Sequence, residues 1–100
     1  MALLNFTGDI SIEQVFVQNK HIIYDLLLKT INENYLDSKK NKIKVLTINI
    51  NEFEHSIEIS RDKFISALNN AIVEFEADEE YEKCKRCIDI ISDIKLKKLN

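Results

Sequence analysis

The strongest structural signal in this chain is a pair of β-prone runs, Ile43-Lys-Val-Leu-Thr-Ile-Asn-Ile50 and Phe53-Glu-His-Ser-Ile-Glu-Ile-Ser60. Only Asn51-Glu52 separates the two runs, which predicts an antiparallel β-hairpin with a two-residue loop over residues 43–60. A longer loop stays open, because Asn-Glu favours this turn less than Asn-Gly does. The short loop pairs Ile50 with Phe53, Ile48 with His55, Leu46 with Ile57, and Lys44 with Ile59.

This register separates apolar from polar side chains. One face of the hairpin carries Leu46, Ile48, Ile50, Phe53, Ile57 and Ile59, and the other carries Thr47, Asn49, Glu54, Ser56 and Glu58. A slip of one residue would destroy the separation, so the pattern itself selects the register. Because an isolated hairpin is only marginally stable, we expect helices to cover its apolar face.

Upstream of the hairpin, residues 11–36 are predicted to form one amphipathic helix. Ser11-Ile-Glu-Gln14 has the form of a capping box. Apolar residues then recur at helical spacing: Ile12, Val15, Phe16, Ile23, Leu26, Leu27, Ile31 and Tyr35. Val17, Ile22 and Leu28 lie off this stripe, which indicates a helix that several elements cover or that meets a partner. We expect residues 1–10 to form an N-terminal arm.

Downstream of the hairpin, residues 61–97 predict a helical hairpin. Ser60 is a suitable N-cap for its first helix, and Asp78 is a suitable N-cap for its second. The apolar stripe of the first helix is Phe64, Ala67, Leu68, Ala71, Ile72 and Phe75, and that of the second is Tyr81, Cys84, Cys87, Ile88, Ile91 and Ile94. The break at Ala77-Asp78 is very short, so the two helices should be antiparallel.

Composition favours a small single domain of the α+β class over residues 1–100, with the order α-β-β-α-α. The chain is 45% hydrophobic, with one Gly, no Pro and two Cys. These values argue against a disordered chain, a many-stranded sandwich, a glycine-rich phosphate loop and a disulfide scaffold. The chain has no apolar run long enough for a membrane span and no signal-peptide pattern, so we expect a cytoplasmic protein.

The charged residues are segregated although the net charge is only −3. That balance argues against direct nucleic-acid binding by electrostatics. Six carboxylates surround the predicted link between the last two helices: Glu74, Glu76, Asp78, Glu79, Glu80 and Glu82. They are interpreted either as solvated helix ends or as a recognition surface for a charged partner.

Cys84-Lys-Arg-Cys87 is the one pattern that resembles a chemical site. A zinc site needs four ligands, and the chain adds only His21 and His55. Redox chemistry places such a pair at a strand-to-helix junction, whereas Cys84 falls on the core stripe of the last helix. Packing is therefore the favoured interpretation, with metal and redox roles as alternatives. His55 is expected to pack on the apolar face, and His21 has no acid near it in the sequence.

Two resemblances bear on function. Tyr81-Glu-Lys-Cys-Lys-Arg-Cys-Ile-Asp-Ile-Ile91 resembles the UVR helical hairpin of excision-repair proteins, whose Glu-x-Ala-x-x-Leu-Arg-Asp-x-Ile core is matched by Glu82, Asp89 and Ile91. Cys84 stands at its Ala position and Ile88 at its Arg position. This resemblance implies a hairpin that mediates protein contacts.

The overall layout, with Lys63-Phe-Ile-Ser-Ala-Leu68 before an acidic link, is similar to small phage-encoded anti-CRISPR proteins that mimic DNA. This resemblance implies that the six carboxylates face the basic cleft of a DNA-binding target. A composition rich in Asn, Lys and Ile is compatible with a phage or a low-GC bacterium.

The sequence thus predicts a small non-enzymatic adaptor or regulator, phage-encoded in one version, that binds another protein. An acidic DNA-mimic inhibitor of a nuclease or other DNA-binding enzyme is the alternative. The expected partner-binding residues are Glu74, Glu76, Asp78, Glu79, Glu80 and Glu82. We expect no cofactor, bound metal, nucleic-acid or membrane contact, and self-association through the first helix is a subsidiary prediction.

Overall fold

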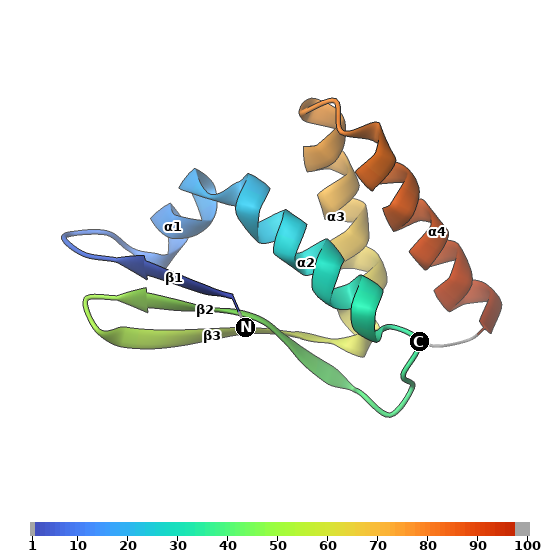
Figure 1. Ribbon diagram of the computed structural model, residues 1–100, viewed down its shortest axis with the longest axis horizontal. Helices are drawn as coiled ribbons and strands as arrows, with labels where there is room; N and C mark the ends of the chain where they lie inside the picture. The colour runs from blue at the N-terminus through green and yellow to red at the C-terminus, as the bar shows by residue number, and fades with distance from the viewer. Residues whose placement is uncertain (1, 98–100) are drawn as a thin grey trace.

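The computed structural model describes residues 2–97 as a mixed sheet with helices on one side (Figure 1). Met1, part of the predicted arm, and residues 98–100 lie outside the described residues. The elements are β1 (Leu3–Phe6), α1 (Ile12–Gln18), α2 (Lys20–Asn34), β2 (Lys42–Ile50), β3 (Phe53–Ser60), the 3₁₀ turn η1 (Arg61–Lys63), α3 (Phe64–Ala77) and α4 (Tyr81–Lys97). The predicted small single domain of the α+β class is confirmed.

The predicted β2–β3 hairpin is present with its two-residue turn. Asn51 and Glu52 both have positive φ, 50° and 72°, as a turn of type I′ requires. Three of the four predicted pairs are confirmed: Ile50 with Phe53, Ile48 with His55, and Leu46 with Ile57.

The fourth predicted pair, Lys44 with Ile59, is wrong because the register shifts between Lys44 and Leu46. Lys44 pairs with Glu58 instead. Val45 and Leu46 are adjacent apolar residues that strict alternation would place on opposite faces, and both are buried. The bulge absorbs the extra residue and allows both side chains to be buried.

The predicted N-terminal arm contains a third strand. β1 pairs in parallel with β2, so the strand order is β1-β2-β3 and the sheet is mixed rather than a lone antiparallel hairpin. A parallel pair needs a crossover connection, which α1 and α2 supply (Figure 1). A run of four residues carries too little pattern to show this pairing in the sequence.

The predicted helix over residues 11–36 is two helices. The capping box at its start is confirmed, with Ser11 and Gln14 bonding each other's backbone N–H groups. The helix breaks at Asn19, whose φ of −126° is outside the helical range. The Asn19 side chain donates to the Val15 carbonyl at 2.8 Å, a local bond by which Asn competes with helical backbone pairing.

The core lies where α2 packs on β2 and α3 packs between α2 and α4. Its fully buried members include Val15, Ile31, Leu46, Ile48, Phe64, Leu68, Phe75, Ile90 and Ile94. The helices cover β2 but not the turn end of β3, so Phe53 is 74% exposed and His55 is exposed. The expectations that Phe53 is covered and that His55 packs on the apolar face are therefore wrong.

Arg61 in η1 joins the sheet to the helical hairpin. Its side chain is buried and donates to three loop carbonyls, those of Tyr35 (3.0 Å), Asp37 and Lys40 (2.9 Å). Ser60 stands at the predicted cap position but makes no side-chain cap bond, and it caps η1 rather than α3. Among the described residues, none of the helices combines the length and the apolar character that crossing a bilayer requires.

Candidate functional site

The turn between α3 and α4 lies at the end of the helical hairpin far from the sheet (Figure 1). It is a Schellman motif: Glu80 N–H donates to the Phe75 carbonyl at 2.8 Å, and Glu79 N–H donates to the Glu76 carbonyl at 3.0 Å. Glu79 has φ 57°, the left-handed conformation in which Gly is usual at this position.

The prediction that Asp78 caps the last helix is wrong. Asp78 is the C-cap of α3, and α4 begins only at Tyr81. The Cys84 N–H donates to the Glu80 carbonyl at 3.2 Å, so Glu80 occupies the N-cap position immediately before α4. The chain reverses direction at Glu79, whose backbone is left-handed. Glu79 and Glu80 therefore belong to the turn, although a direct connection would have placed them in α4.

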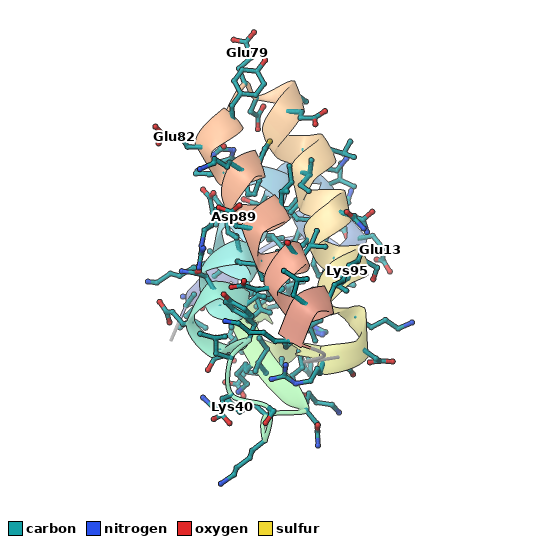
Figure 2. The ribbon with its side chains drawn as sticks, turned by 90° about the vertical axis from the view of Figure 1, so that its right-hand side faces the viewer. Glu13, Lys40, Glu79, Glu82, Asp89 and Lys95 are labelled. Carbon is teal, nitrogen blue, oxygen red and sulfur yellow. The ribbon has the colours of Figure 1, made fainter. Side chains whose placement is uncertain are left out.

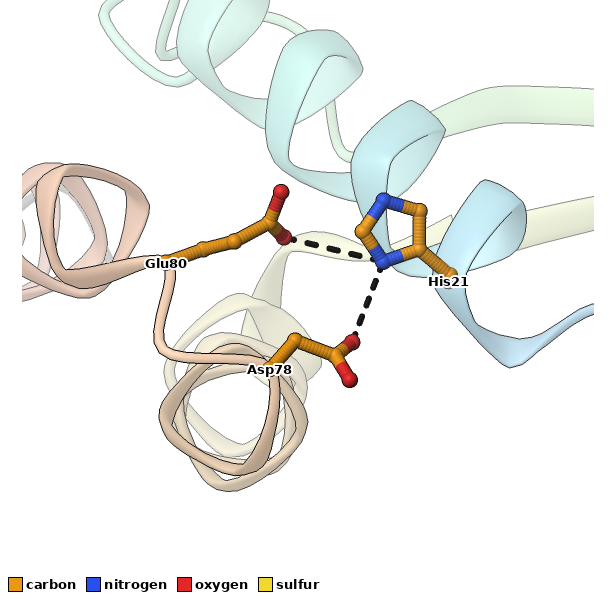
Figure 3. Close-up of side chains that lie close together, drawn as sticks. All are labelled: His21, Asp78 and Glu80. Atoms are coloured by element: carbon orange, nitrogen blue, oxygen red, sulfur yellow. Dashed lines mark hydrogen bonds and ion pairs between the residues drawn. The ribbon is translucent and has the colours of Figure 1, made fainter.

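Two of the six predicted acidic residues turn inward toward α2 (Figure 3). The Nδ1 atom of His21, in the first turn of α2, lies 3.1 Å from Asp78 Oδ2 and 3.6 Å from Glu80 Oε2. Asp78 and Glu80 are 57 and 59 residues after His21 in the chain. Folding therefore brings together three groups that no sequence motif connects.

Asp25 and Lys83 complete this arrangement, which we call the His21 cluster (His21, Asp25, Asp78, Glu80 and Lys83). Asp25 Oδ2 lies 3.3 Å from His21 Nε2. Lys83 Nζ lies 2.7 Å from Asp25 Oδ1 and 3.0 Å from Glu80 Oε1. The cluster thus ties the start of α2 to the α3–α4 turn.

The carboxylates favour the charged forms of both basic groups in the cluster. The hydrogen bond with Asp78 is the main cause that raises the pKa of His21, and the charges of Asp25 and Glu80 add to it. The pKa of Lys83 is raised mainly by its hydrogen bond with Asp25. These groups are part-exposed, so water and salt screen their interaction.

The other four predicted residues do not join the cluster. Glu76, Glu79 and Glu82 are exposed and Glu74 is half-buried, and none of them forms an ion pair within residues 2–97. Figure 2 shows Glu79 at the far end of the hairpin and Glu82 pointing outward from α4. With Tyr81, which is 63% exposed, the three exposed carboxylates form what we call the acidic tip (Glu76, Glu79, Tyr81 and Glu82).

Local sequence reasoning missed the His21 cluster. The expectation that no acid lies near His21 is wrong, because Asp25 follows at the i+4 position of the same helix. That spacing was the one available signal, since helical residues four apart are neighbours. Asp78, Glu80 and Lys83 reach His21 only through the packing of α3 against α2 and α4.

Cys84 and Cys87 are free thiols buried in the core, as the packing interpretation predicts. Burial raises the pKa of both thiols, that of Cys87 to about 11. A thiol protonated at neutral pH is a poor nucleophile and a poor metal ligand. The neighbourhood of Cys84 and Cys87 therefore supports packing over chemistry.

The surface expected to mediate self-association is only partly exposed. Val17 and Ile22 are exposed, whereas Leu28 is buried in the core. An apolar groove runs beside Val17 between the α1–α2 region and β3, and Phe16, Tyr24 and Ile57 also line it.

Comparison with known proteins finds no matching family model, no matching curated protein and no matching solved structure. The resemblances to the UVR hairpin and to DNA-mimicking anti-CRISPR proteins remain predictions.

Proposed function

We propose that this protein is a small non-enzymatic regulator that binds a basic surface of another protein through the acidic tip. The observation that carries the proposal is the contrast within the six predicted carboxylates. Asp78 and Glu80 form ion pairs with His21 and Lys83, whereas Glu76, Glu79 and Glu82 face outward without a counter-ion among the described residues. Carboxylates left unpaired on a protruding element attract a basic partner.

Two further features support a protein partner. The side chain of Tyr81 is mostly exposed and lies beside the carboxylates. Tyrosine is enriched among the hot-spot residues that contribute most of the binding energy of protein interfaces. The His21 cluster links the turn to α2, and such a link should lower the entropy that the tip loses on association. A cytoplasmic location belongs to the same proposal and agrees with free, unpaired Cys84 and Cys87.

The test compares three forms of the chain as immobilised bait. The tip variant is Glu76→Gln/Glu79→Gln/Glu82→Gln. The matched control, Glu13→Gln/Glu33→Gln/Glu54→Gln, removes the same charge from exposed positions outside the tip. Captured proteins are identified by mass spectrometry, and affinity for each purified candidate is then measured by calorimetry at two salt concentrations.

We expect one partner to bind the wild type and the control equally and the tip variant at least tenfold more weakly. Added salt should weaken the wild-type interaction, because the attraction is between exposed charges. A partner that binds all three forms with equal affinity would contradict the proposal. Circular dichroism of the tip variant establishes that the fold is intact.

A DNA-mimic inhibitor is the alternative, and the same unpaired carboxylates favour it. Such a protein competes with DNA for its target, so the identified partner would be a DNA-binding enzyme and duplex DNA would displace it. A regulator acting at another surface of its partner would not be displaced. With two of the six carboxylates committed to the His21 cluster, we favour the regulator.

Self-association is a separate proposal that rests on the exposed side chains of Val17, which lines the apolar groove, and Ile22. Light scattering of the wild type and of Val17→Ser over a concentration series tests it. We expect a dimer that Val17→Ser weakens. A monomer at every concentration would contradict it.

A further inference from the structure

The Nδ1 atom of His21 faces two carboxylates but carries at most one proton. Its contact with Asp78 at 3.1 Å is a hydrogen bond. Glu80 Oε2, at 3.6 Å, is a buried atom that has no hydrogen-bond partner among the described residues. A buried carboxylate oxygen without a donor is unfavourable. One proton on Nδ1 can therefore satisfy Asp78 but not Glu80 as well, whereas a metal cation between the three groups would contact all of them.

We propose that His21, Asp78 and Glu80 bind one divalent first-row transition-metal ion of the Zn²⁺ type. Zn–N and Zn–O bonds of about 2.0–2.1 Å in a tetrahedral site place neighbouring ligand atoms roughly 3.3 Å apart. The distances from His21 Nδ1 to Asp78 Oδ2 and Glu80 Oε2 are 3.1 and 3.6 Å, on either side of that value. The three ligand atoms all lie within 4.8 Å of one another, so only a modest side-chain adjustment separates them from tetrahedral spacing.

The surroundings of His21 match those of a metal ligand. A histidine that binds a metal through one ring nitrogen usually donates its other N–H to a carboxylate, which fixes the ring and its tautomer. Asp25 stands at Nε2, 3.3 Å away. Lys83 in turn holds Asp25 and the second oxygen of Glu80. Ring and carboxylate are thus oriented before any ion binds.

Charge balance also favours a divalent ion. With the imidazole neutral, Asp25, Asp78 and Glu80 contribute three negative charges and Lys83 one positive charge, so the cluster carries a net charge of −2. One imidazole among the ligands favours a transition metal over Mg²⁺ or Ca²⁺, which prefer an all-oxygen shell. His21 and Asp78 have side chains 48% and 43% exposed, so an ion can reach the site from solvent.

The test is titration of the chelator-treated, desalted protein with Zn²⁺ by calorimetry, followed by Co²⁺ absorption spectroscopy. We expect one Zn²⁺ per chain in the wild type. His21→Ala and the double variant Asp78→Asn/Glu80→Gln should bind at least tenfold more weakly. Asp25→Asn should bind about 10-fold to 100-fold more weakly, as expected for loss of the carboxylate behind a ligand histidine. Mg²⁺ and Ca²⁺ should bind far more weakly than Zn²⁺.

His55→Ala is the matched control, because His55 is exposed and lies outside the cluster. Its Zn²⁺ affinity should equal that of the wild type. The Co²⁺ spectrum should lack the sulfur charge-transfer band that binding by Cys84 or Cys87 would produce. Absence of Zn²⁺ binding, equal binding by the wild type and His21→Ala, or a sulfur band would each overturn the proposal.

A measurement on the wild type alone tests the proposal if a variant fails to fold. The imidazole NMR signals of His21 in the wild type should shift on addition of Zn²⁺, while those of His55 should not. Unmoved His21 signals would overturn the proposal. The tip variant Glu76→Gln/Glu79→Gln/Glu82→Gln should keep its Zn²⁺ affinity, which separates this site from the acidic tip.

Discussion

The carboxamide of Asn51 bonds to the backbone of Gly8 in both directions. Its Nδ2 donates to the Gly8 carbonyl at 2.7 Å, and its Oδ1 accepts the Gly8 N–H at 2.9 Å. The Asn51 N–H also donates to the Phe6 carbonyl at 3.0 Å. The residue that forms the β2–β3 turn therefore also holds the segment that follows β1.

This double role predicts opposite effects for glycine at the two turn positions. Asn51→Gly keeps the positive φ but loses both side-chain bonds, so it should lower the free energy of unfolding by about 1–2 kcal/mol. Glu52→Gly relieves a left-handed residue whose side chain forms no hydrogen bond within residues 2–97, so it should raise the free energy of unfolding by about 1 kcal/mol. Urea denaturation measures both. Two changes of the same sign would contradict this account of Asn51.

Glu79 should be replaced by glycine with a gain in stability. Its φ of 57° places a side chain where the Schellman motif favours Gly, so Glu79→Gly should raise the free energy of unfolding by about 1 kcal/mol. Glu79→Ala removes the same charge without the conformational freedom and is the control. If both variants are equally stabilised in urea denaturation, charge repulsion rather than backbone strain is the cause.

The buried guanidinium of Arg61 should resist even conservative replacement. The guanidinium donates to the carbonyls of Tyr35, Asp37 and Lys40, and a lysine ammonium lacks the planar fork needed to reach them together. Arg61→Lys should therefore lower the free energy of unfolding by about 2–3 kcal/mol. Lys63→Met, an exposed change two residues away, should stay within about 0.5 kcal/mol of the wild type. Thermal and urea unfolding are the measurements, and equal effects of the two changes would contradict the role of Arg61.

The thiols should be inert while the protein is folded. The pKa of Cys87 is raised to about 11 by burial, so at pH 8 about one thiol in a thousand is a thiolate. We expect slow labelling by a disulfide reagent at pH 8 in buffer and rapid labelling of both cysteines in urea. Rapid labelling of the native protein would show that the α3–α4 interface opens.

Tyr35 should make stability depend on alkaline pH. Its hydroxyl donates to Asp93 Oδ2 at 2.6 Å, and this bond is the main cause that raises the pKa of Tyr35 above its ordinary value of 10.0. A raised pKa in the folded state contributes stability that is fully present below pH 10 and is lost as the pH rises through the folded value. Tyr35→Phe should therefore cost about 1 kcal/mol at pH 7 and progressively less above pH 10. A constant difference between the two proteins across this range would contradict the assignment.

Much of the architecture could be predicted from local pattern. The alternation in residues 46–50 and 53–57 selected the hairpin register, because one slip would have turned the apolar side chains to solvent. Helical spacing located α3 and α4, and the capping box at Ser11 located the start of α1. Each of these signals lies within a few residues of the sequence, so each can be recognised without knowledge of the tertiary structure.

The candidate site could be predicted only in outline. The six carboxylates were identified as a group, but whether each one faces solvent or a neighbour depends on the α3–α4 turn. Glu79 adopts the left-handed conformation, and this turns Asp78 and Glu80 toward His21 while Glu76 and Glu82 stay exposed. A shift of the turn by one residue would have changed that division.

Local periodicity thus sufficed for most of the hairpin register, the apolar stripe of α3 and the acidic character of the last link, because those features follow from side-chain spacing along one element. It was only partly right for α4, where Tyr81 and Ile88 of the predicted stripe are exposed and Ile90 is buried instead. Packing alone placed β1 beside β2, joined Asn51 to Gly8, and gathered His21, Asp78 and Glu80 at one point. Those contacts join segments 43 to 59 residues apart, and their partners meet only after burial of the core has set the positions of α2, α3 and the sheet.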